Sequence, residues 1–154
     1  MAFGRYEIKK VRKIRTTGEV DVSVDAASQA TIYDTGKLDY PVNLKYIHFN
    51  TTSYKMRFRV LLYDENGNLV CIHDGSVINN VGYWIGPETL NSYAVSNSTQ
   101  WFRLDRYDTT GNQYDISWVP PVDFIGYGFK IEAFNLDTST ITNKVWIVYE
   151  EIEL

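Results

Sequence analysis

The sequence has few of the residues that usually build a metal centre. Its 154 residues include one cysteine and two histidines. A single cysteine excludes an internal disulfide, and Cys71 lies in an apolar stretch where a small buried side chain is expected rather than a nucleophile. His48 and His73 fall on separate predicted strands, and no Cys or His pair has zinc spacing. We therefore expect no metal site and no cofactor.

Motifs that mark catalytic sites are also missing. The sequence contains no Gly-x-Ser-x-Gly elbow and no glycine-rich phosphate loop. Residues 64–68 begin like a calcium loop, but Leu69 stands where that loop needs glycine, and Gly75 where it needs a bidentate acid. Four aspartates could supply a carboxylate pair for glycoside hydrolysis, although acids beside strand turns are usually solvated: Asp105, Asp108, Asp115 and Asp123. The sequence predicts a protein that is not an enzyme.

Long hydrophobic runs are absent. No run approaches the length that crosses a bilayer, and the N-terminus lacks the apolar core of a signal peptide. We expect a chain that is made in a cytoplasm and does not enter a membrane.

The charges are unevenly distributed. Residues 1–15 carry six basic side chains and one acid, a balance of +5, so the remaining nine basic and 18 acidic residues give −9, for a net charge of −4. Residues 1–17 are therefore predicted to be a basic N-terminal arm ordered by a partner, or an edge strand protected by charge. The acidic body would repel a polyanion, so we expect the arm to dock on an acidic protein surface and not on nucleic acid. The expected contact residues of the arm are Lys9, Lys10, Arg12, Lys13 and Arg15.

The strongest local pattern is a β-hairpin. In residues 56–63 apolar side chains alternate with Arg57 and Arg59, and a second strand follows at residues 69–73. The turn between them contains Asn66-Gly67, which supplies the positive φ angles that a tight reversal needs.

Similar alternation recurs along the chain. Strands are predicted at residues 19–25, 28–33, 42–49, 77–85, 99–107, 113–119, 124–134 and 144–153, and a long loop with one helical turn after Pro87 at residues 86–98. In residues 42–49 we place Val42, Leu44, Tyr46 and His48 on one side. The 12 Tyr, 7 Phe and 4 Trp suit pleated strands. The sequence predicts an all-β fold, an antiparallel two-sheet β-sandwich of jelly-roll type over residues 18–154.

Aromatic side chains mark two candidate contact surfaces. Trp146 and Val148 lie opposite Val145 and Ile147 on the last strand, so this strand is apolar on both faces and another protein or subunit is expected to cover its outer face. Exposed rings can also stack on sugars, and we select Trp84, Trp101 and Tyr107 as candidate glycan-binding residues. For Trp101, the alternative is that the ring packs under the 86–98 loop.

The runs at residues 54–70 and 124–134 resemble jelly-roll modules of bacteriophage virion proteins and of carbohydrate-binding modules. The resemblance implies a virion structural protein, such as a capsid decoration or accessory protein or a tail protein, made in the host cytoplasm. Its expected partners are major capsid or tail proteins and further copies of itself in a homo-oligomer. The alternative is a carbohydrate-binding module or receptor-binding domain.

Overall fold

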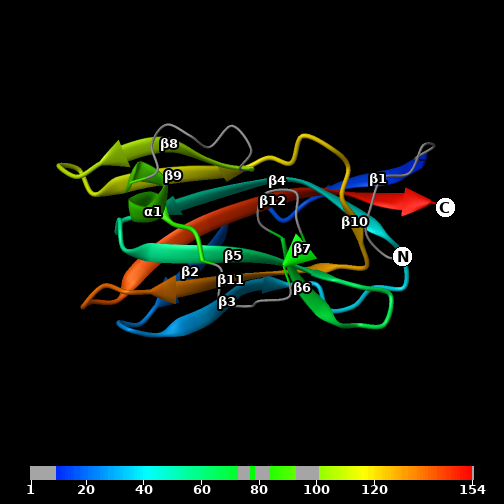
Figure 1. Ribbon diagram of the computed structural model, residues 1–154, viewed down its shortest axis with the longest axis horizontal. Helices are drawn as coiled ribbons and strands as arrows, with labels where there is room; N and C mark the ends of the chain where they lie inside the picture. Colours follow the sequence, from blue (N-terminus) through cyan, green and yellow to red (C-terminus); the bar gives the residue numbers. More distant parts are fainter. Residues whose placement is uncertain (1–9, 73–76, 79–83, 93–100, 154) are drawn as a thin grey trace.

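The computed structural model describes residues 10–72, 77–78, 84–92 and 101–153, and it confirms an all-β sandwich of two antiparallel sheets (Figure 1). The larger sheet has the order β1 (Lys10–Thr16), β12 (Ile141–Glu153), β4 (Val42–Thr51), β9 (Gln113–Trp118), β8 (Phe102–Asp108), with β2 (Val20–Val24) also paired to β12 and β10 (Ile125–Gly126) to β4. The smaller sheet has the order β3 (Gln29–Asp34), β11 (Phe129–Asn135), β5 (Met56–Tyr63), β6 (Leu69–Ile72), β7 (Val77–Ile78).

The connectivity is that of a jelly roll. Eight of the strands are divided equally between the sheets, in the neighbour orders β2-β12-β4-β9 and β3-β11-β5-β6. These strands form four antiparallel pairs, β2 with β12, β3 with β11, β4 with β9 and β5 with β6. Four such pairs divided between two sheets make the two Greek keys of a jelly roll. Strands β1, β7, β8 and β10 and the short helix α1 (Pro87–Ser92) are additions to that frame.

The predicted hairpin forms between β5 and β6, with Tyr63 opposite Leu69. Its turn differs from the expected one, because only Gly67 has a positive φ, at 85°, and Asn66 does not. The Gly67 N–H donates to the Asp64 carbonyl at 3.1 Å, and the Asp64 N–H donates to the Asn68 carbonyl at 2.8 Å. This is a three-residue loop that ends in a left-handed glycine.

An extra residue in β4 overturns the predicted face of that strand. Tyr46 pairs with Val148 and Leu44 with Tyr149, so Lys45 has no partner on β12. This bulge reverses the alternation: Val42 and Leu44 point inward before it, and buried Ile47 and Phe49 point inward after it. Tyr46 and His48 therefore face outward, on the side opposite the one predicted.

The predicted single strand at residues 124–134 is wrong, since it is two strands in different sheets. β10 continues the line of β9 along β4 after the Pro120-Pro121 break, and the chain then crosses to the smaller sheet as β11. Gly128 lies at the crossing with a φ of 116°, where a Cβ would collide with the Gly36 carbonyl. The close approach of the Gly36 backbone therefore requires glycine at this position.

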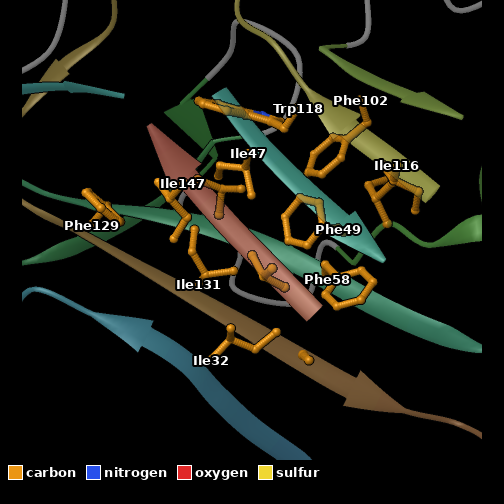
Figure 2. Packing of buried hydrophobic residues seen from close by; sticks show 14 of the residues in the cluster. Ile32, Ile47, Phe49, Phe58, Phe102, Ile116, Trp118, Phe129, Ile131 and Ile147 are labelled. Carbon is orange, nitrogen blue, oxygen red and sulfur yellow. The ribbon is translucent and has the colours of Figure 1, made fainter. Parts of the chain in front are cut away.

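The core fills the space between the sheets (Figure 2). Phe49 from the larger sheet lies 4.5 Å, between ring centroids, from Phe58 of the smaller sheet. Trp118, Ile47 and Ile147 are also fully buried. Burial of these side chains is the main favourable term in folding, about 1.5–3 kcal/mol for each large apolar side chain.

Several predicted segments are only partly described, and residues 93–100, which belong to the predicted 86–98 loop and 99–107 strand, lie outside the described residues. Of residues 1–17, the described part from Lys10 onward forms the end strand β1. Of the strand expected at 77–85, residues 77–78 form β7 and residues 79–83 lie outside the described residues, as does His73. The helical turn expected after Pro87 is present as α1. None of the described helices has the length and hydropathy to cross a bilayer.

Candidate docking face on the larger sheet

The outer surface of the larger sheet carries an exposed tryptophan on its long strand β12. Val145 and Ile147 are fully buried against the core, whereas Trp146 between them is 37 % exposed and Val148 is half-buried. Successive side chains of a strand point to opposite faces, so Trp146 and Val148 share the outer face. The sequence predicted this placement for both residues.

Two residues of β4 complete the surroundings of Trp146. His48 lies opposite Trp146 and Tyr46 opposite Val148 in the β4–β12 ladder. The His48 and Trp146 rings pack at a centroid separation of 4.7 Å and a tilt of 55°. Sequence reasoning missed both neighbours, because the Lys45 bulge that turns them outward leaves no mark in the hydrophobic pattern.

Strand β1 extends the apolar surface to the end of the sheet. Ile14 pairs with Glu150 and is 67 % exposed, and Thr16 pairs with Val148. Paired residues share a face, so Ile14 is a diagonal neighbour of Val148 on the outer side. Val11, 38 % exposed, lies farther along the same face. We call the group formed by Ile14, Tyr46, Trp146 and Val148 the Trp146 face.

Polar side chains border this face over β4, β8 and β9. The Nε2 atom of His48 lies 3.1 Å from Oδ1 of Asp115, which also accepts a 2.9 Å hydrogen bond from Asn50. Ser117 bonds to Asp105, which accepts a 2.8 Å bond from Arg103. These bonds connect the polar side chains of β4, β8 and β9 to one another. The face is therefore apolar around Ile14, Trp146 and Val148 and polar over β8 and β9, which is the composition of an interface core beside its rim.

The predicted basic residues of the arm are not equivalent. Lys9 lies outside the described residues, and Lys10 and Arg12 belong to β1. Lys13 is exposed. Arg15 donates a 2.8 Å hydrogen bond from Nε to the buried carboxylate of Glu151, which raises the pKa of Arg15. Arg15 thus has an ion-pair partner within the chain while its side chain is 43 % exposed, and its contact with a partner protein stays a prediction.

The three candidate glycan-binding rings are not brought together. Trp101 is buried, with ring centroids 5.7 Å from Trp118 and 5.5 Å from Phe124, so its expected exposure is wrong. Residues 93–98 of the loop expected to cover it lie outside the described residues. Tyr107 packs edge-on against Tyr114 at 5.1 Å.

Trp84 lies over the other sheet, with the Arg59 guanidinium 4.1 Å above its ring. Its edge meets Phe134 at a centroid separation of 5.7 Å. Cation–π and edge-to-face contacts of this kind fix the ring on the outer surface of β5 and β11. Trp84 therefore cannot form one sugar platform with Tyr107 of β8.

Within the described ranges, no group of three or more His, Cys, Asp or Glu side chains is arranged to hold a metal ion. The features that remain are a rigid jelly roll and a mixed apolar and polar sheet face.

The fold defines the protein as an antiparallel jelly-roll β-sandwich. No protein-family model matches the chain, and no curated protein matches it in sequence. Among solved structures, the chain is similar to a chain in the structure of the infectious bursal disease virus Gt strain. The identity is 10 % and the TM-score 0.26, and the match covers 91 % of this chain and 42 % of the viral chain.

A crystal structure of the VP2 subviral particle of infectious bursal disease virus gives 7 % identity and a TM-score of 0.26, over 93 % of this chain and 43 % of the other. The chain thus spans less than half the length of these viral chains. Likeness at this level is too low to carry an argument about function.

Proposed function

We propose that the protein is a non-enzymatic structural component of a virion, a capsid decoration or accessory protein of a bacteriophage. It docks on other virion proteins through the Trp146 face and acts there as a homo-oligomer. The observation that carries the proposal is the exposure of Trp146 and Ile14 on a sheet face whose other side is fully buried. Jelly rolls serve in viral capsids and in lectins, so the fold supports the class by analogy alone.

The physical case for docking rests on the cost of leaving this surface in water. Ile14 and Trp146 lie on adjacent strands, and burying side chains of their size is worth about 1.5–3 kcal/mol each. Tryptophan is also enriched among the residues that dominate binding energy at interfaces. Trp146 packs on His48, which Asp115 holds in turn, so little side-chain freedom is lost when a partner covers the ring.

Particles of the virus that encodes the chain, grown with its gene interrupted, provide the test. Purified protein is added back and its co-sedimentation with these particles is measured. We expect wild-type protein to bind and Trp146→Ser to bind at least about tenfold more weakly, as for a central interface tryptophan. Leu136→Ser is the matched control, because Leu136 is 48 % exposed in the loop between β11 and β12. Equal binding of Trp146→Ser and wild type, or no binding of wild type, contradicts the proposal.

A further inference from the structure

Two strands share one open edge of the larger sheet and carry opposite charges. β1 and β2 both pair with β12, β1 from Val148 to Glu153 and β2 from Ile141 to Val145, so they follow each other along the same side. No described strand pairs with their outer side. We propose that this edge pairs, antiparallel and about a two-fold axis, with the same edge of a second copy of the chain.

The backbone of this edge can form a ladder. The Thr17 N–H donates to the Ile147 carbonyl at 3.0 Å, so the main chain of Thr17 faces β12. Successive residues of a strand alternate in this respect, and the N–H and C=O groups of Ile14 and Thr16 therefore point away from β12 into the open edge. The same alternation holds along β2. Val145 and Asn143 lie two and four residues before Ile147, so their backbone groups point to the same side and bond to Val20 and Val22. The backbone N–H and C=O of Asp21, between these two residues, therefore point outward. Unpaired groups of this kind are a template for another strand.

The charge pattern identifies the partner. The β1 half of the edge contains four basic residues and no acid, whereas residues 19–25 contain three acids and no base. Arg15 is paired with Glu151, so the charges left for a second copy are those of Lys10, Arg12 and Lys13 against those of Glu19, Asp21 and Asp25. Parallel pairing of two copies would oppose like charges, which is destabilising. Antiparallel pairing about a two-fold axis places each basic half beside an acidic half, twice in one interface. An acidic strand from another protein would match only the β1 half.

Charge also makes the edge selective. Lysine and arginine on an edge strand, together with the bulge between Val11 and Lys13, discourage indiscriminate pairing. Only a partner with the reverse order of charges removes that penalty. A two-fold axis perpendicular to the sheet keeps both Trp146 faces on one side, so the pair presents a doubled docking surface. The inference rests on the proposed function in taking the chain as an assembly component, and it names the surface through which copies meet.

The test is the mass of the isolated full chain, by light scattering and sedimentation at low and raised salt. We expect twice the 17.8 kDa chain mass, with tighter association at low salt. Ile14→Pro removes an outward N–H from each copy and should weaken the dimer about tenfold or more. Ile14→Thr keeps that N–H while losing the apolar side chain, and it should remain a dimer. A monomeric wild type, or Ile14→Pro as dimeric as Ile14→Thr, overturns the proposal.

Charge exchange tests the two-fold arrangement. Replacing Lys10, Arg12 and Lys13 by Glu, or Glu19, Asp21 and Asp25 by Lys, should each weaken the dimer. Combining both sets should restore the dimer, because each reversed half again meets its opposite. A combined variant weaker than both of the partial variants overturns the arrangement. Trp146→Ser should leave the dimer intact while losing particle binding, so the dimer and the docking face can fail separately. Circular dichroism and thermal melting establish that each variant is folded.

Discussion

Arg59 and Glu132 form a buried ion pair whose disruption should be costly. They lie opposite each other on β5 and β11, and Nε and Nη2 of Arg59 lie 2.7 and 2.6 Å from Oε1 of Glu132. The side chains are 10 % and 8 % exposed. Lys130 adds a contact of 3.3 Å to the same carboxylate, and Trp84 covers the guanidinium. Replacing Glu132 leaves a buried cation without its anion.

We expect Glu132→Gln to lower the free energy of unfolding by about 3–5 kcal/mol, the usual cost of removing one partner of a buried pair. Domains of this kind are stable by only about 5–15 kcal/mol, so the loss is a third or more of the total for most of that range. With a urea m-value of about 2 kcal/mol/M, the unfolding midpoint should fall by roughly 1.5–2.5 M. The assay is equilibrium urea unfolding followed by tryptophan fluorescence.

Two control variants separate the effect of the buried charge from other effects of the substitution. Arg103→Ala breaks an exposed pair with Asp105, in which the arginine is 70 % exposed, and should cost less than about 1 kcal/mol. Arg59→Met combined with Glu132→Leu removes both charges and should recover most of the loss. A cost below about 1 kcal/mol for Glu132→Gln would refute the reasoning, because it would mean that water already solvates the pair. A double variant as unstable as the single one would place the energy in packing instead.

Further predictions concern the core, the crossing and alkaline pH. Phe49→Ala should cost about 3–5 kcal/mol in thermal unfolding, since the ring is fully buried against Phe58, and a cost under about 1 kcal/mol would contradict this. Gly128→Ala should cost more than Gly67→Ala, because both glycines have positive φ but only the Cβ at Gly128 meets backbone; equal melting temperatures would refute it. Burial and then the 2.7 Å bond to Asp34 raise the pKa of Tyr63 from 10.0 to about 12, so its stabilisation is complete below pH 10 and is lost as the pH rises toward 12. Between pH 10 and 12 the free energy of unfolding of wild type should fall relative to that of Tyr63→Phe. A difference between the two that does not change with pH would show that the pKa of Tyr63 is the same in the folded and unfolded chain.

The sequence predicted the elements whose side chains alternate without interruption. Period-two patterns over residues 56–63 and 144–149 set which side chains point into the core, because a strand has only two faces. The outward position of Trp146 followed from this rule alone. The charge split between residues 1–15 and the rest was visible too, although the sequence could not show that β1 and β2 share one edge.

The misplaced residues depended on contacts between distant segments. Tyr46 and His48 changed sides because one inserted residue reverses a strand, and nothing local distinguishes a bulged lysine from a paired one. Trp101 alternates with Phe102 like an outward residue, but the chain around Phe124 folds over it. Trp84 lies over Arg59 of β5 and Phe134 of β11, and contacts between residues so far apart in the sequence cannot be predicted from the hydrophobic period.

The position of β12 has a consequence for biosynthesis. This strand follows the other eleven described strands in the sequence, yet it supplies the ladder for β1, β2 and β4. While the ribosome is still translating residues 141–153, β1, β2 and one side of β4 lack the only strand that pairs with them among the described residues. Closure of the larger sheet must then wait for residues 141–153 to emerge, and such long-range pairing is slow and open to aggregation. Nascent chains stalled before residue 141 should therefore depend on chaperones to remain soluble.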